Sequence, residues 1–482
     1  MSYYFISIGG SGSKIMEALT HLCVAGILPG REELNVIALD PDSGNGNFER
    51  ASSLIIDFTK FQDMPVGNEP VLFKNKVQVV KPFPWKFDTH NAKLDDLMNA
   101  NIIKGTPLGK LYSALYTTKE RATPLTEGFR GHPSIGAAVL AQRFLFQNDE
   151  GWRQLIGQIQ NNVGNSNGAK IFLAGSIFGG TGAAGIPTIA RLLRNKLEAY
   201  AGRVSIGGVF LLPYFTFIAD DNENELYARS KNFLTNAKAA LKYYSQGKND
   251  FDYMYFIGDS SPVNVSFSIG GNEQRNNSHI VELYAALAAA DFFASEARAG
   301  QGTEYKYICR REELVYDWED FRNIVPDFQE KFVQFARFIF AYNQLVAPII
   351  KNPPQQNFFA RLFSNKTPPW YVDLIKRPHV NIFTDEVRCF ERYSLAFCNW
   401  LKQIETLDGR QVSLIKPSFF SVSQGNVSIS VDDFSSCDFL DSNLTVAKVS
   451  ERLNAPSGDW NKLAAKDFGK LLRFLYESCR KI

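Results

Sequence analysis

Apolar and polar residues follow two alternating periods along the first 300 positions of the chain. Short apolar runs at residues 3–8, 35–39, 170–174, 204–212 and 253–257 predict buried strands. Between them apolar residues recur every three or four positions, which predicts helices. Strands that alternate with helices form a mostly parallel sheet with helices on both faces, so the pattern predicts an α/β fold of Rossmann-like type.

Three helices matter for the argument that follows. One is expected over about 186–200 with Pro187 in its first turn, a long core helix over about 224–244, and another over 279–294. After about residue 300 aromatic-rich helical stretches and a strand-like run near 426–431 predict a mixed α+β region. We therefore expect a first domain over 1–245 that includes the core helix, with 50–127 resembling an insertion, and a second domain over 246–482.

Composition excludes several classes of protein. Of the 482 residues 45% are hydrophobic and 21% charged, which is ordinary for globular domains. With 52 Lys and Arg against 50 Asp and Glu, the net charge of +2 gives no field that favours nucleic acid or an acidic membrane. The six cysteines form no CxxC pair, so neither a disulfide scaffold nor a zinc site is indicated. We expect a cytoplasmic protein without a signal peptide or membrane span.

Two glycine-rich loops stand between a predicted strand and a predicted helix: GGSGSK at 9–14 and FGGTGAAG at 178–185. Such loops expose backbone N–H groups and the positive end of a helix dipole, and glycine lets a ligand approach closely. A phosphate group is the expected ligand. The alternative is that these glycines only make tight turns. The presence of two such loops in one predicted sheet favours phosphate binding over this alternative.

The sequence departs from two common phosphate-binding motifs. A Walker loop is excluded because Lys14 is followed by Ile15. Gly180, Gly182 and Gly185 fit the dinucleotide pattern GxGxxG, but no acid ends the next strand. The first loop has Asp40 at the end of its next strand but lacks the third glycine. A dinucleotide-dependent enzyme therefore stays an alternative.

The run GGTGAAGIPTIA resembles the phosphate loop of the tubulin/FtsZ family, and further family elements follow in the family's order. GGSGSK resembles the first loop, ALDPDSGN the acidic second loop, and GHPSIG at 131–136 the third loop, GxxPxxG. VFLLPYF and DDNENELYARS resemble the strand and the start of the long core helix that contact guanine. Ala183 and Ala184 depart from the family, which usually has Thr or Ser and then Gly there.

The resemblance implies a tubulin/FtsZ-type fold that binds GTP or GDP, with Mg2+ at Asp42. It places the nucleotide against Gly9, Gly10, Ser11, Gly12, Ser13, Asp40, Gly131, His132, Pro133, Gly136, Phe178, Gly179, Gly180, Thr181, Gly182 and Ala183. For the guanine it implies hydrogen bonds from Asn222 or Asn224 and stacking on Phe217 or Tyr214.

A last element resembles the family's catalytic loop, NxDxxD/E. Asn277 and Glu282 match it, and His279 stands where the family usually has Asp. The resemblance implies that Glu282 of one subunit orients the attacking water at the nucleotide of the next, so that GTP is hydrolysed on head-to-tail assembly into filaments. A non-polymerising nucleotide-binding scaffold or switch is the alternative. An operon-encoded protein partner for the C-terminal half is a further expectation.

Overall fold

The fold is taken from a computed structural model of the chain. It describes residues 1–30, 33–42, 44–68, 71–86, 93–125, 129, 131–141, 149–165, 168–217, 230–246, 250–259, 262–265, 275–296, 298, 302–308, 315–316, 318–321, 324–353, 367–405, 411–412, 414, 420–423, 426–429, 444, 446–455 and 465–480.

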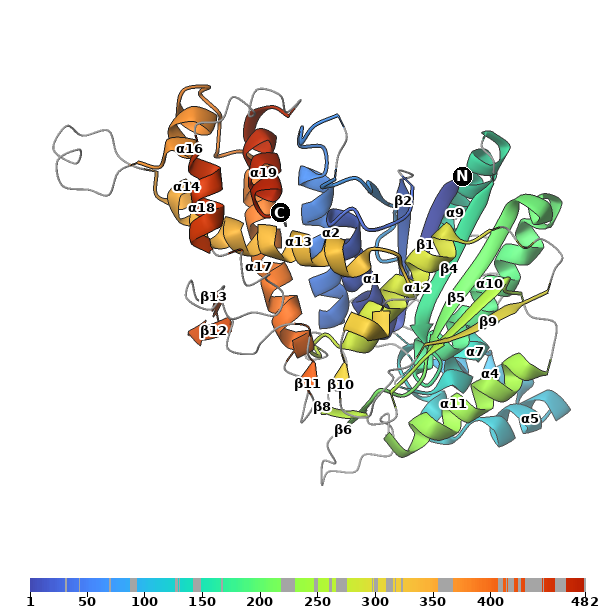
Figure 1. Cartoon of the computed structure of the whole chain (residues 1–482). Helices are drawn as coiled ribbons and strands as arrows, with labels where there is room; N and C mark the ends of the chain where they lie inside the picture. The colour runs from blue at the N-terminus through green and yellow to red at the C-terminus, as the bar shows by residue number, and fades with distance from the viewer. Residues whose placement is uncertain are drawn as a thin grey trace.

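A seven-stranded parallel sheet in the order β3-β2-β1-β4-β5-β7-β9 forms the centre of one half of the molecule (Figure 1). Its strands are β1 (Ser2–Ile8), β2 (Leu34–Leu39), β3 (Val77–Val79), β4 (Ala169–Ser176), β5 (Val204–Leu211), β7 (Tyr253–Ile257) and β9 (Glu304–Ile308). The predicted α/β class with a mostly parallel sheet is confirmed. β7 and β9 complete this sheet, which therefore extends beyond residue 245.

Helices cover both faces of the sheet because its strands are apolar on both sides. On β1, Tyr3 and Phe5 belong to one core cluster, and Tyr4 and Ile6 belong to the other. The first face carries α1 (Gly9–Val24), α2 (Gly46–Phe61) and α12 (Ile280–Ala294); the second carries α7 (Pro133–Leu140), α9 (Glu150–Asn165) and α10 (Gly180–Lys196). Shorter elements between β3 and α7 are α3 (Leu94–Leu97), α4 (Ala100–Ile103), α5 (Pro107–Leu115) and α6 (Thr118–Arg121).

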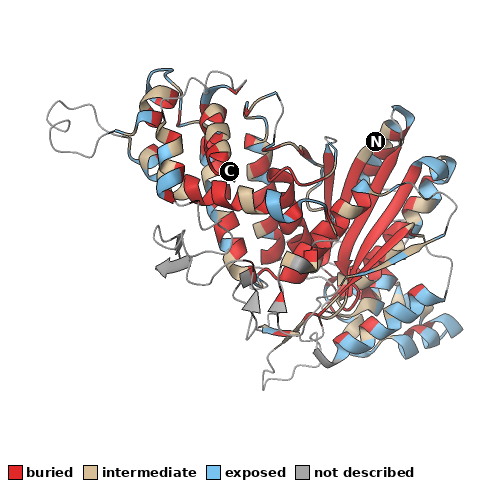
Figure 2. Ribbon diagram, in the orientation of Figure 1, coloured by how far each residue is buried: buried red, intermediate tan, exposed pale blue. Residues whose placement is uncertain are grey.

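The central helix is α12, and the prediction of the core helix over 224–244 is wrong. Every residue from Ile280 to Phe293 except Asp291 is buried, and α12 packs against α1, β4, β5 and β7. α11 (Ser230–Ser245) instead lies at the surface with much of its length exposed (Figure 2). Its Leu234 and Leu241 are exposed. A helix that is apolar all round belongs in the core, whereas one with a single apolar stripe lies at the surface.

The start of α10 is also earlier than predicted. The helix begins at Gly180, so Pro187 lies in its interior rather than in its first turn. The glycine run is therefore the first turn and a half of the helix, which places backbone N–H groups, and not a long loop, at the end of β4.

The C-terminal half is mainly helical and packs on α1 and α2 (Figure 1). Its elements are η4 (Trp318–Phe321), α13 (Phe328–Ala341), η5 (Tyr342–Val346), α14 (Ala347–Lys351), α16 (Pro369–Tyr371), η6 (Val372–Lys376), α17 (Asp385–Glu405), α18 (Val446–Asn454) and α19 (Asp467–Ser478). Small strand pairs join β10 (Val315–Tyr316) to β11 (Gln411–Val412), β12 (Phe420–Ser423) to β13 (Asn426–Ile429), and β6 (Phe215–Phe217) to β8 (Val263–Val265); η2 (Glu198–Arg203) precedes β5.

One helical run among the described residues, Phe328–Lys351, is long and apolar enough for a membrane span. Its most apolar window is 61% buried inside the fold. Phe332, Phe335 and Phe338 of this run lie in the core against α17 and α19. Packing within the helical half accounts for its apolar character.

Candidate functional site

The glycine turns after β1 and β4 lie in contact with each other. Gly9 has a positive φ of 71°, and a Cβ placed on it would be 3.1 Å from the Cβ of Thr181. The second loop joins them, since a Cβ on Gly10 would be 2.9 Å from Nδ2 of Asn45, the residue that caps α2. Three segments that are distant in sequence therefore meet at the carboxyl edge of the sheet.

The third loop completes the same group. A Cβ on Gly180 would be 2.9 Å from the Cβ of Phe129 and 3.1 Å from the backbone N of Gly131. A Cβ on Gly136 would be 2.8 Å from the Cβ of Ala184, so α7 and α10 start side by side. The N-termini of α1, α7 and α10 thus gather at one place, and helix N-termini are suited to bind anions.

Two glycines of these turns contact the sheet rather than a neighbouring turn. A Cβ on Gly12 would be 2.6 Å from the carbonyl O of Ala174, and one on Gly182 would be 2.4 Å from the carbonyl O of Ser176. These two glycines let α1 and α10 pack closely on β4.

Asp40 and Asp42 follow β2 at the same edge. Asp40 is 3% exposed; its Oδ1 accepts a hydrogen bond from the backbone N of Asp42 at 3.1 Å, and its Oδ2 has no partner among the described residues. Burial, with a smaller contribution from the charge of Asp42, raises the pKa of Asp40 to about 8.

The acid pair fits Mg2+ as two ligands rather than as a complete cage. In the part of the chain that the structure describes, no group of three or more His, Cys, Asp or Glu could hold a metal ion. Mg2+ is usually held by one or two carboxylates together with waters and substrate phosphates. The unpartnered Oδ2 of Asp40 and the carboxylate of Asp42 can supply those two oxygen ligands.

The protonation of Asp40 leads to a testable pH dependence. Asp40 loses its proton near pH 4 in the unfolded chain and near pH 8 in the folded protein. The free energy of unfolding therefore falls as the pH rises between these values, by up to about 1.4 kcal/mol per pH unit. We expect urea denaturation of the nucleotide-free protein to show this fall and Asp40→Asn to lack most of it. Asp63→Asn, at a side chain that is 82% exposed, is the control. Equal slopes for wild type and Asp40→Asn would contradict the assignment.

Glu282 is enclosed at the start of α12. It is 0% exposed and forms an ion pair with Lys14 of α1. Its Oε1 accepts a hydrogen bond from the hydroxyl of Tyr214 at 2.7 Å, and its Oε2 accepts one from the backbone N of His279 at 2.8 Å. Burial lowers the pKa of Lys14, opposed by Glu282, and burial beside Glu282 raises that of Tyr214. Through these contacts the carboxylate links α1, the start of α12 and the segment after β5.

The segment that leads into α12 is held against α2. Arg50 donates to both carboxylate oxygens of Glu17 at 2.8 Å and to the carbonyl O of Asn276 at 2.9 Å. The backbone N of Asn276 donates to Oδ1 of Asn47 at 3.0 Å. Asn277 follows directly and is exposed, close to the second loop. The segment before the central helix therefore lies beside the second loop, at the same edge of the sheet as the glycine turns.

A model of the family described as "Tubulin like" matches residues 4–335, about two thirds of the chain. The chain belongs to the tubulin-like family. The match covers the sheet, its helices and all the glycine turns, so the resemblance seen in the sequence is confirmed at the level of the family.

Solved structures similar to this tubulin-like protein are distant. They include CetZ1 from Haloferax volcanii as a GDP-bound monomer (13% identity, 62% of each chain, TM-score 0.29). CetZ2 from the same organism, as a GTPγS-bound protofilament, has 15% identity over 61% of this chain and 59% of its own, with a TM-score of 0.27. TubZ of Clostridium botulinum phage c-st, truncated at its C-terminal tail, has 13% identity over 59% and 58%, with a TM-score of 0.27.

This chain thus spans about three fifths of the length of those structures. No curated protein matches it significantly.

The predicted catalytic role of Glu282 needs correction. In the tubulin-like protein this carboxylate has no exposed surface and already binds Lys14 and Tyr214, so it does not lie on the surface that a second subunit would contact. His279 is 2% exposed, and its Nδ1 accepts a hydrogen bond from the backbone N of Val281, as a helix cap. The segment NSHIVE starts the central helix and is not a loop that follows it.

The aromatic residues that were predicted to contact the nucleotide differ in their exposure. The ring of Tyr214 is 1% exposed and contacts His279 and Lys14, and the ring of Phe178 is 1% exposed and packs on Phe233, so neither is open to a base. Phe217 is half-buried at the end of β6 and stays a candidate for stacking. Asn222 and Asn224 lie outside the described residues.

Other predicted residues lie at or beside the glycine turns. His132 precedes α7, with its Nδ1 3.3 Å from a carboxylate oxygen of Glu120. Ser13 is 1% exposed, and its hydroxyl donates back to the carbonyl O of Gly9, whereas Ser11 is half-buried. Pro133, Gly179 and Ala183 are also half-buried at the helix starts. Their contacts with a nucleotide stay predictions.

Sequence reasoning missed the buried Lys14–Glu282 pair and the Arg50 network. A signal for the first pair was present at Glu282, which stands in a run that is otherwise almost wholly apolar. A charge on a fully buried helix requires a partner of opposite sign. Which two helices supply that pair depends on the tertiary fold.

Proposed function

We propose that this tubulin-like protein binds GTP or GDP with Mg2+ at the carboxyl edge of its sheet. The contact of Gly9 with Thr181 and of Gly131 with Gly180 is the observation that carries the proposal, since it brings three helix N-termini around one space. The backbone N–H groups of the turns bind the phosphates, and Asp40 and Asp42 bind the metal ion through their carboxylate oxygens.

The purine base is proposed to lie at the N-terminus of α12. The family resemblance assigns guanine recognition to an Asn at the start of the core helix, and the core helix here is α12. Asn277 therefore replaces Asn222 and Asn224 as the best candidate. Its amide is exposed and can both donate to and accept from the edge of guanine.

Assembly is proposed to be head to tail, because the two ends of α12 lie at opposite edges of the sheet. At its C-terminal end, Lys170 Nζ and the Tyr3 hydroxyl donate to the carbonyl O of Phe293 at 2.9 and 3.3 Å, and these residues begin β4 and β1. A helix of 15 residues is about 22 Å long. Stacked subunits would bring the segment after α12 of one copy over the nucleotide of the next, a contact that generates filaments.

Glu296 is the exposed carboxylate that follows α12, and we propose that it orients the attacking water in the neighbouring subunit's site. Glu296→Gln is expected to retain GTP binding and to lower the GTP turnover of the assembled protein by about 100-fold. Phosphate release measured with pelleted protein tests this. Glu330→Gln, at an exposed position of α13, should hydrolyse GTP like the wild type. Unchanged turnover in Glu296→Gln would remove the assignment.

A non-polymerising nucleotide switch is the second candidate, favoured by direct contacts of the helical half with α1 and with the segment before α12. His21 of α1 lies 3.0 Å from the hydroxyl of Tyr393, and Gln403 accepts a hydrogen bond from the backbone N of Ser278 at 2.9 Å. Nucleotide-dependent movement of α1 would thus reach α17. Sedimentation with GTP separates the candidates, because a switch stays in the supernatant whereas filaments pellet.

A dinucleotide-dependent enzyme would instead bind NAD+, and a titration with NAD+ tests this alternative.

A further inference from the structure

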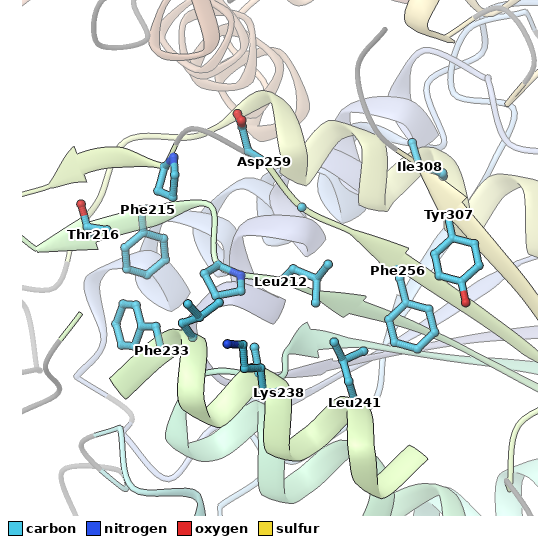
Figure 3. Close-up of a pocket in the computed structure, with 15 residues that line it drawn as sticks. Leu212, Phe215, Thr216, Phe233, Lys238, Leu241, Phe256, Asp259, Tyr307 and Ile308 are labelled. Carbon is cyan, nitrogen blue, oxygen red and sulfur yellow. The ribbon is translucent and has the colours of Figure 1, made fainter. Parts of the chain in front are cut away.

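A cavity of about 750 Å3 lies outside the glycine turns, between α11 and the carboxyl ends of β5, β7 and β9 (Figure 3). Its walls are almost entirely apolar. They include Leu212, Phe215, Phe233, Leu241, Phe256 and Ile308. Pockets of 300–1,000 Å3 commonly hold small organic ligands, and in open parallel sheets ligands bind beyond the carboxyl ends of the strands.

Two charged residues line this apolar cavity, and only one of them is available to a ligand. The carboxylate of Asp259 is 9% exposed and accepts a hydrogen bond from the hydroxyl of Tyr316. Lys238, on α11, is exposed and forms no ion pair with any of the described residues (Figure 3). An occupant with an apolar body and one anionic group therefore matches the cavity, whereas a sugar or a second nucleotide would leave its polar groups unpaired.

We propose that this cavity binds an amphipathic carboxylate of the fatty-acid class. The hydrocarbon body lies between Phe233 and Leu241 of α11 and Phe256 of β7, and the carboxylate pairs with Lys238 at the rim. Tyr307 of β9 is 74% exposed beside the cavity and would be partly covered by the ligand. The site does not depend on nucleotide binding, so it can be tested alone.

The cavity wall also touches the phosphate loop. The rings of Phe215 and Phe233 lie 5.4 and 4.9 Å from the ring of Phe178, measured between centroids. Asn236 of α11 donates a hydrogen bond to the carbonyl O of Phe178 at 3.1 Å. Phe178 directly precedes Gly179 and the start of α10. A ligand that moves α11 would thus alter the phosphate loop, a coupling that rests on the proposed function.

Binding can be measured with 11-(dansylamino)undecanoic acid, whose fluorescence rises in apolar surroundings. The wild type is expected to bind this probe, and Lys238→Glu to weaken its affinity by about tenfold or more because the charge is reversed. Lys242→Glu is the matched control, since Lys242 is exposed on the same helix and does not line the cavity. Ala237→Trp should abolish binding because Ala237 lines the cavity and the indole fills it.

The outcomes separate the proposal from its alternatives. The methyl ester of the probe should bind the wild type more weakly than the acid does, because it lacks the charge that pairs with Lys238. No binding of the acid to the wild type, or equal affinity in Lys238→Glu and Lys242→Glu, would overturn the proposal. Thermal melting shows whether each variant is folded, and the exposed lysine variants keep the test valid if Ala237→Trp is not. GTP affinity, measured separately, reports on the proposed function, and only its change with bound probe reports on the coupling.

Discussion

Replacing Glu282 with alanine is expected to lower the free energy of unfolding by about 3–5 kcal/mol, because the change leaves the buried ammonium of Lys14 without its partner. The hydroxyl of Tyr214 also loses its acceptor. Urea denaturation followed by circular dichroism measures the change. A role in catalysis alone would instead abolish GTP turnover and leave stability intact.

Two companion variants make the test specific. Asp373→Ala also removes the carboxylate of an ion pair, here with Arg377 at the surface, and should lower the free energy of unfolding by less than about 1 kcal/mol. The double variant Lys14→Met with Glu282→Leu should be considerably more stable than Glu282→Ala, since apolar residues can replace a buried ion pair. A change below about 1 kcal/mol in Glu282→Ala would contradict the structural role assigned to this carboxylate.

Gly180→Val is expected to weaken GTP binding by about 100-fold, the effect of losing one or two hydrogen bonds from backbone N–H groups to a charged phosphate. The first side-chain carbon alone would lie 2.9 Å from the Cβ of Phe129 and 3.1 Å from the N of Gly131, and valine adds two methyl groups. The turn at α10 and the turn before α7 must then separate. Fluorescence titration with a labelled GTP analogue on the folded variant measures the loss.

Gly157→Val is the matched control for this substitution. Gly157 lies in α9, and a Cβ there meets no atom within 4 Å. Valine should be accommodated at that position with GTP affinity unchanged. If Gly180→Val binds GTP as tightly as Gly157→Val does, the turns do not form the phosphate site.

The strands were predictable because apolar runs bounded by glycine and polar loops require no tertiary information. The run at 253–257 coincides with β7, and 204–212 exceeds β5 by one residue. Buried and exposed residues do not alternate along these strands, because helices cover both faces of a parallel sheet. The run length and its flanking turns therefore carried the prediction.

The errors have physical causes that are visible in the sequence. A glycine run has low helix propensity, yet Gly180 to Gly185 are helical because α10 must pack closely on β4 and α7. The wrong core helix followed from the resemblance of DDNENELYARS to the start of the family's core helix, whereas the run over 280–294 is apolar on nearly every side and therefore belongs in the core. Once α12 is recognised as central, Glu282 becomes a buried partner and Asn277 a ligand candidate.

The segment 50–127 was the hardest to predict. It contains most of α2, whose buried Leu54, Phe58 and Phe61 follow a helical period. The short helices between β3 and α7 depend instead on tertiary contacts, such as the hydrogen bond of the Tyr116 hydroxyl to the carbonyl O of Ser134 at 3.3 Å. Local pattern alone does not specify elements of four residues such as α3 and α6.

A crystal structure of the full chain with GTPγS and Mg2+ tests the central claim most directly. The account predicts the triphosphate between the turns at Gly10, Gly131 and Thr181, with the metal ion beside Asp40 and Asp42 and the base facing Asn277. A nucleotide bound elsewhere on the molecule, or these turns empty at saturating GTPγS, would contradict it.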